Sequence, residues 1–263
     1  MTSAPRPSAG SQPGGSTTTA PDVVTGPTVR DELARALERS QAQPSARVRS
    51  TMDAPMGMLV VDQTGTMDGS VVDGSTPLPG MGDVEFRMLG GYVYYAFPDL
   101  PPGKTWVSLD NDQFRELTGL DLSALSSQSG QVPAFSAGGL GEVRRIGPDD
   151  VDGRPATLYE ADVDLTGAMQ QAVDAGTMSG PALDGMEAFA PETTFEYWVD
   201  EDGLLARVHY DLEIVDAVAG FTERQVGSTV SYDVTFSDYG VAIDTSPPDP
   251  STVVPFDQFE PGG

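Results

Sequence analysis

Residues 193–215 read TTFEYWVDEDGLLARVHYDLEIV, and this segment carries the strongest structural signal in the chain. Two runs of alternating apolar and polar residues flank Asp202-Gly203, and Asp-Gly between such runs is typical of a tight β-hairpin. After the turn, alternation places the even-numbered residues from Leu204 to Ile214 on one face and the odd-numbered residues from Leu205 to Glu213 on the other. This return strand is about 36 Å long at about 3.3 Å per residue, longer than most strands. One apolar and one charged face predict a large antiparallel sheet that is solvated on one side.

The two ends of the chain differ in composition from the middle. Residues 1–27 are rich in Pro, Gly, Ser and Thr, which predicts a disordered tether that cannot bury enough apolar surface to fold. Residues 246–263 carry five prolines and are assigned to a Pro-rich C-terminal tail. Residues 28–245 remain as one folded domain, which is long enough to enclose a sizeable core.

Charge and cysteine content exclude several classes of function. The net charge of −26 repels phosphate backbones, so we expect no nucleic-acid partner. The sequence has no cysteine, which rules out disulfides and thiolate metal sites. It has no apolar run near the roughly 18 residues that a membrane helix needs. No signal peptide is visible, and a chain that opens on a tether is typical of a mature secreted protein whose signal has been removed.

Between the ends, short alternating runs dominate and a few amphipathic helices interrupt them. Strands are predicted at 46–53, 56–63, 66–72, 84–89, 92–96, 104–110, 141–147, 156–164 and 228–238, in addition to the hairpin, and 74–83 is predicted to be a loop. Helices are predicted at 28–41, at 112–118, from Leu165 through Met169 and Val173, and around Met186 and Phe189. A sheet of about eleven strands twists and curls. The helices must bury their apolar stripes against its apolar face. The predicted class is therefore α+β, a curved antiparallel sheet with short helices on its concave face.

Three segments resemble a known family. They are LGEVRRIGPDDVDGRPATLYEADVDL (140–165), YWVDEDGLLAR (197–207) and YDVTFSDYGV (232–241). They are similar to the envelope lipoproteins of high-GC Gram-positive bacteria in the LppX/LprG group. The resemblance covers about residues 28–245 and implies a LolA-like half-barrel, in which the curved sheet and a helical lid enclose a hydrophobic lipid cavity.

The resemblance also implies a location and partners. Family members are extracytoplasmic and carry a diacylated Cys just before a tether of this kind, and Met1 stands at that place here. It implies a lipid or an acylated glycolipid as ligand and a membrane anchor in the native form. A secreted form is the other option, and we expect a monomer.

The polar residues do not form a catalytic pattern. His209 is the only histidine and lies between Arg207 and Asp211 on the polar face of its strand, which favours a surface role over acid–base chemistry. The acidic runs 149–152 and 200–202 lie at hairpin turns, where Asp is ordinary, and lack the ligand spacing of a twelve-residue calcium loop. We therefore predict no enzyme activity, no metal and no cofactor.

The apolar residues carry the functional prediction. The ten methionines have two interpretations that stay open on the residues alone: they fill a core, or they form a deformable cavity wall. Sheltering a sixteen-carbon chain yields roughly 12 kcal/mol at about 0.8 kcal/mol per CH₂, enough for tight binding without a polar contact. The alternative is a non-carrier envelope sensor or interaction module with a filled core. The residues predicted to line the lipid cavity are Phe86, Met88, Tyr95, Phe97, Trp106, Leu165, Met169, Val173, Met186, Phe189, Tyr197, Val208, Tyr210 and Val234.

Overall fold

The computed structural model describes residues 23–55, 57–78, 82–97, 100–118, 139–174, 188–217 and 222–259. Within them, one sheet contains thirteen strands in the order β1-β8-β9-β10-β11-β12-β2-β3-β4-β5-β6-β7-β13. Neighbours are antiparallel except for β13, which runs parallel to β7. The strands are β1 Val24–Thr25, β2 Ser45–Ala54, β3 Gly57–Thr66, β4 Val71–Leu78, β5 Gly82–Leu89, β6 Tyr92–Ala96, β7 Trp106–Asp110, β8 Leu140–Val151, β9 Arg154–Asp164, β10 Glu192–Asp200, β11 Leu205–Glu213, β12 Thr229–Ser237 and β13 Val253–Pro255.

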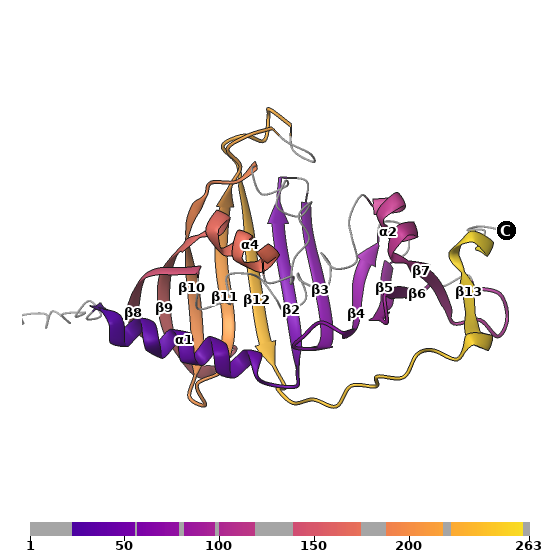
Figure 1. Ribbon diagram of the computed structural model, residues 1–263, viewed down its shortest axis with the longest axis horizontal. Coiled ribbons are helices and arrows are strands. Elements are labelled where there is room, and N and C mark those ends of the chain that lie inside the picture. The colour runs from indigo at the N-terminus through magenta and orange to yellow at the C-terminus, as the bar shows by residue number, and fades with distance from the viewer. Residues whose placement is uncertain are drawn as a thin grey trace, which may run out of the picture.

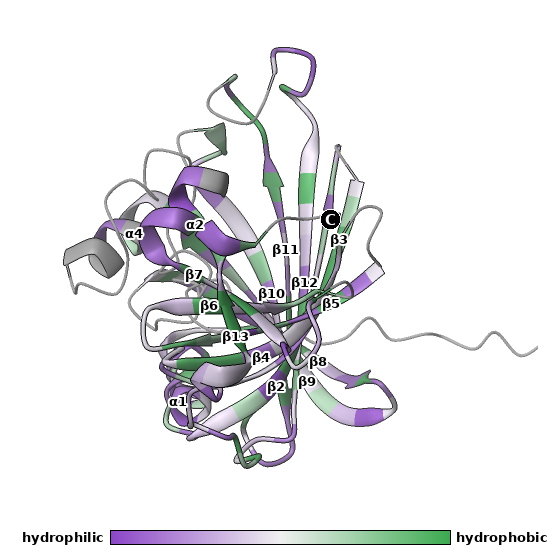
Figure 2. Cartoon of the chain, turned by 90° about the vertical axis from the view of Figure 1, so that its right-hand side faces the viewer, coloured by the Kyte–Doolittle hydropathy of each residue, from purple (hydrophilic) through white to green (hydrophobic). Residues whose placement is uncertain are grey.

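Three helices lie on one side of this curved sheet, as Figures 1 and 2 show. They are α1 (Pro27–Gln41), α2 (Asn111–Thr118) and α4 (Leu165–Asp174). We call the face they cover the inner face and the opposite one the outer face. The predicted class, a curved open sheet with short helices on one face, is confirmed.

Helix α1 covers the inner face of the long strands. It begins at Pro27, whose fixed φ suits the first turn of a helix. Its buried stripe is Val29, Leu33, Ala36 and Leu37, and these side chains join the main core formed by β8–β12 and β2. Ser40 fixes its last turn, because its Oγ donates to the Ala36 carbonyl and accepts from the amide of Leu205.

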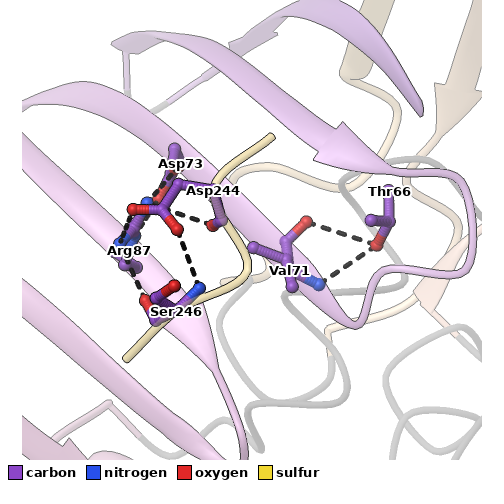
Figure 3. A network of polar contacts seen from close by, with 6 residues as sticks. All are labelled: Thr66, Val71, Asp73, Arg87, Asp244 and Ser246. Atoms are coloured by element: carbon purple, nitrogen blue, oxygen red, sulfur yellow. Dashed lines mark hydrogen bonds and ion pairs between the residues drawn. The ribbon is translucent and has the colours of Figure 1, made fainter. Parts of the chain in front are cut away.

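The predicted loop at 74–83 is wrong for most of its length. Strand β4 continues to Leu78 and β5 starts at Gly82. Gly74 serves close packing here, because a Cβ at this position would lie 2.7 Å from both the Phe86 ring and the Asp62 carbonyl oxygen. The turn lies earlier, inside the predicted strand 66–72. There the Thr66 hydroxyl accepts from the amide of Val71 and donates to its carbonyl, as Figure 3 shows.

The alternation predicted for the start of β11 is also wrong. A β-bulge shifts the β10–β11 register after Trp198, so that Trp198 pairs with Arg207 and Val199 with Leu205. Leu205 therefore belongs to the main inner core, and Ala206 packs with Trp198 in a small separate cluster. An inserted residue of this kind exchanges the faces of its neighbours.

The C-terminal segment after β12 runs along the sheet to its far edge, as the yellow ribbon in Figure 1 shows. We call residues 238–259 the strap. Arg87 donates to the carbonyls of Asp244 and Ser246 while it pairs with Asp73, and Figure 3 shows this network. Lys104 donates to the carbonyls of Ser251 and Val253, just where β13 adds to β7. Composition assigns 246–263 to a tail, yet these residues contribute a strand.

Candidate functional site

A continuous row of side chains crosses the inner face from β8 to β3. The pairing registers place its members side by side, and in strand order they are Val143, Ala161, Phe195, Tyr210, Tyr232, Met52 and Leu59. All of them are apolar or aromatic. The next row contains Tyr159, Tyr197, Val208, Val234, Ser50 and Val61. The two rows form a largely apolar wall on one face of the sheet.

Stacked rings form the middle of this wall. The Phe195 and Tyr210 rings lie 4.2 Å apart, and the Tyr210 and Tyr232 rings 4.8 Å apart, in nearly parallel planes. Burial raises the pKa of the Tyr210 hydroxyl well above its usual value, with a smaller contribution from the neighbouring Tyr232. Burial likewise raises the pKa of Tyr232. The phenols therefore stay neutral at ordinary pH, and the wall carries no charge there.

Burial falls along the wall from β8 towards β3. Phe195 is fully buried, Tyr232 is partly buried, and Leu59 is 38% exposed. We call Tyr232, Ser50, Met52, Leu59 and Val61 the β2–β3 shelf. The Ser50 hydroxyl on this shelf is buried and has no hydrogen-bond partner among the described residues. The shelf is the part of the apolar wall that stays accessible.

A second apolar cluster lies on the inner face of β4–β7. Its buried members are Val72, Met88, Val93, Val107, Leu109 and, from α2, Phe114. Phe86, Tyr95, Phe97 and two strap residues, Phe256 and Phe259, pack against it. The Phe97 and Phe259 rings stack at 5.3 Å. Burial raises the pKa of Tyr95, so this hydroxyl too stays neutral.

The predicted wall residues fall into these two clusters. Leu165, Tyr197, Val208, Tyr210 and Val234 are buried in the main core and Phe189 packs against it, whereas Met88, Phe86, Tyr95 and Phe97 belong to the second cluster. The register places Trp106 on the outer face, because its neighbour Val107 shares the inner face with Tyr95. Met169 and Val173 lie in α4, but their side chains are outside the described part, as is the whole of Met186.

Sequence reasoning missed the residues that lead to the shelf, namely Phe195, Tyr232, Met52, Leu59 and Val61. Two of them had a usable signal, because Phe195 alternates with Tyr197 and Tyr232 with Val234. For Met52 and Leu59 the sequence gives alternation but does not say which strand lies next to β12. That neighbour is β2. The pairing of Val234 with Ser50 joins residues 184 positions apart in the sequence, and only the tertiary structure brings them together.

Among the hollows lined by described residues, two have several charged side chains in their lining. The first has a volume of about 530 Å³ and lies between α1 and β8–β10, with Arg35, Arg39, Arg145 and Tyr159 in its lining. The second has a volume of about 740 Å³ and lies on β2–β5, with Arg47, Asp62, Glu85 and Trp106 in its lining. Neither is walled by the apolar row. The candidate ligand surface is therefore the wall with its open shelf.

His209 lies among charged residues on the outer face. Its ring nitrogens lie 3.6 Å from an Asp233 oxygen and 3.7 Å from an Asp211 oxygen. Its Nδ1 is buried without a hydrogen-bond partner in the described part of the chain. Arg207 also pairs with Asp233 and lies 4.5 Å above the Trp198 ring. These residues form a strip of paired charged side chains on the outer face, and the Ser231 hydroxyl donates to Asp211 beside it.

The described residues offer no metal centre and no membrane span. Among them, no group of three or more His, Asp or Glu side chains is placed to hold a metal ion. Their helices are too short or too polar to cross a bilayer.

The curved open sheet, with its covered inner face, defines a LolA-like half-barrel. Two solved structures of lipoproteins share this fold. LppX of Mycobacterium tuberculosis matches with a TM-score of 0.50 and 17% identity, over 84% of this chain and 99% of LppX. LprF of Mycobacterium bovis matches with a TM-score of 0.53 and 15% identity, over 85% of this chain and 98% of LprF.

A sequence relative comes from Streptomyces griseus. It is an uncharacterized 31.2 kDa protein from the rplA–rplJ intergenic region, 28% identical over 219 residues, which span 79% of this chain and 67% of that protein. No family model matches the chain. The half-barrel fold that the resemblance implies is confirmed by the structure.

Proposed function

We propose that this protein is a non-enzymatic envelope carrier that binds a lipid or an acylated molecule on the inner face of its half-barrel. The observation that carries the proposal is the apolar wall that runs unbroken from a fully buried core to the exposed Leu59. An exposed apolar surface that continues a core is suited to an apolar ligand. The lipoprotein fold supports an extracytoplasmic location, with an N-terminal lipid anchor in the native form.

The wall is suited to an acyl chain for energetic reasons. The phenols of Tyr210 and Tyr232 are neutral, so an acyl chain lying along the first row meets no charged member of that row. Each buried CH₂ contributes about 0.8 kcal/mol, and a long chain therefore binds tightly after ordering costs are subtracted. The Ser50 hydroxyl, which has no hydrogen-bond partner in the part of the chain that the structure describes, lies next to this path.

The direct test is organic extraction of the purified protein followed by mass spectrometry. We expect acylated species to be released in near-stoichiometric amount. An extract without acylated species, together with a delipidated protein that takes up no fatty-acid probe, contradicts the proposal.

Two neighbouring residues of β3 give a matched pair of variants. Leu59 lies on the inner face and Met58 on the outer face, and both are exposed, at 38% and 66%. We expect Leu59→Asp to weaken binding of a fluorescent sixteen-carbon fatty acid about tenfold, because it removes roughly 1.5 kcal/mol or more of apolar contact. Met58→Asp adds the same charge on the other face and is expected to leave binding unchanged. Equal effects of the two substitutions would place the ligand elsewhere.

The alternative is a non-carrier envelope sensor or interaction module with a filled core. The complete burial of Tyr197 and Val208 beneath α1 favours it, since the wall is closed at that point. Under this alternative the extract is empty and the fatty-acid probe does not bind. The two experiments above therefore separate the candidates.

A further inference from the structure

The 530 Å³ hollow beside α1 differs in character from the apolar wall. We call it the arginine pocket. Arg35 and Arg39 enter it from one face of α1, four residues apart, and Arg145 enters it from β8. Arg145 pairs in register with Tyr159, whose buried ring also lines the pocket. Three arginines therefore line one hollow together with an aromatic side chain.

These three arginines differ from most others in the protein. Arg47, Arg49, Arg87, Arg115, Arg144 and Arg207 each have a carboxylate oxygen within 4.0 Å. Within the described residues, Arg35, Arg39 and Arg145 have none. The sequence has 40 acidic and 14 basic side chains, so carboxylates are abundant as partners. Like charges at i and i+4 on a helix are destabilising, yet Arg35 and Arg39 occupy such positions without a carboxylate partner in the described part of the chain. The Arg35 Nε donates to the Asp31 carbonyl at 2.9 Å, and its other guanidinium donors have no carboxylate partner there.

The carboxylates of the pocket are already engaged or exposed. An Asp200 oxygen accepts from the amide of Leu204 at 2.8 Å and holds the β10–β11 turn. A Glu32 oxygen accepts from the Tyr159 hydroxyl at 3.4 Å. Glu201 is exposed at the tip of the turn. The guanidinium groups thus keep most of their donors for a guest.

We propose that the arginine pocket binds a phosphate group. A guanidinium presents paired N–H donors in a planar fork that matches phosphate oxygens, and several forks around one hollow suit a doubly charged anion. The pocket is built from α1, β8, β9, β10 and the turn after β10, and shares no residue with the β2–β3 shelf. It shares Tyr159 with the second row of the apolar wall, but the phosphate proposal does not rest on lipid binding.

The test uses the full chain and two phosphate sources. Calorimetric titration with inorganic phosphate measures the free ion, and titration with soluble dihexanoyl phosphatidic acid measures a lipid headgroup. Dihexanoyl phosphatidylcholine, whose phosphate is part of a zwitterion, is titrated in parallel. We expect binding of one or both anionic probes that weakens as salt rises.

Variants tie the signal to the pocket. Arg39→Gln and Arg145→Gln are each expected to weaken phosphate binding about tenfold, since each removes a charged hydrogen-bond donor. Arg154→Gln is the control, because Arg154 is exposed, lies outside the pocket and has no carboxylate within 4.0 Å among the described residues. Thermal unfolding of each variant verifies that it folds.

The outcomes are distinct. Binding of inorganic phosphate that is lost in both pocket variants supports a free phosphate guest, and binding of phosphatidic acid alone supports a headgroup. The proposal is overturned if neither probe binds, or if binding survives in Arg39→Gln and Arg145→Gln as it does in Arg154→Gln. Fatty-acid uptake is measured on the same variants and is expected to be unchanged, so failure here leaves the lipid proposal standing.

Discussion

Gly74 illustrates how a single residue is set by its neighbours across the sheet. Turn-forming composition around it favours a loop, but the residue lies in the middle of β4. Phe86 from β5 and Gln63 from β3 approach it so closely that a Cβ has no space. The glycine is thus required by side chains 11 and 12 positions away in the sequence, and local propensity does not report such a constraint.

Arg144 provides a residue-level prediction about pH. It donates to both oxygens of Asp162 at 2.9 and 3.2 Å, and this contact holds the pKa of Asp162 below its usual value. A lowered folded-state pKa stabilises the fold above the ordinary Asp value of about 3.9, and this stabilisation is lost as pH falls through the folded pKa.

We therefore expect Arg144→Met to destabilise the protein at pH 7 and the difference from the parent to shrink below about pH 4. Urea unfolding at several pH values measures it. Arg154→Met, which removes an exposed arginine without an ion pair in the described part, serves as control. A difference that is the same at pH 3 and pH 7 contradicts the assignment.

At the scale of elements, the strap supplies an edge strand and two rings to the second cluster. Strand β13 covers β7, and Phe259 stacks on Phe97. The parallel pairing of β13 with β7 joins strands about 150 residues apart, so the hydrogen bonds of β7 depend on the end of the chain.

A chain that ends at Asp249 tests this dependence. It lacks β13 and both rings, and we expect the amides of β7 to exchange with deuterium much faster, because β7 becomes an unprotected edge. Exchange in β10 and β11 is expected to stay slow. A chain that ends at Phe259 keeps the whole strap and is the control. Unchanged protection of β7 in the shorter chain would show that the strap does not hold this edge.

At the scale of the whole molecule, the net charge and the sheet topology both bear on the stability of the fold. Strands β3 and β4 pair at four positions only, so a short ladder joins the long strands to β4–β7. The strap also connects the two parts, through Arg87 and β13. A net charge of −26 spread over such a structure is self-repulsive.

We expect the melting temperature at pH 7 to rise as sodium chloride increases from 0.01 to 0.2 M, because the Debye length shortens from about 30 Å to below 10 Å. Salt also screens the ion pairs, which acts in the opposite direction. Acidic groups outnumber basic ones by 40 to 14, so relief of repulsion dominates. Calorimetry at constant protein concentration measures the effect, and a melting temperature that falls with salt would show that the ion pairs matter more.

The sequence by itself determined the elements whose signals are local. The 193–215 hairpin, helix α1 with its stripe and the strand 228–238 depend on apolar periodicity and turn residues within one segment. These signals were sufficient to predict a curved sheet and to identify much of its apolar face, including Tyr197, Val208 and Tyr210.

Only the tertiary structure decided which strands are neighbours and therefore which side chains share a site. It split the predicted wall into two clusters, put Trp106 on the outer face, extended the wall to Met52 and Leu59, and gathered three arginines beside α1. The physical reason is that strand order and bulges depend on contacts between distant segments. A one-residue shift in register exchanges the two faces of a strand, and no local pattern encodes that shift.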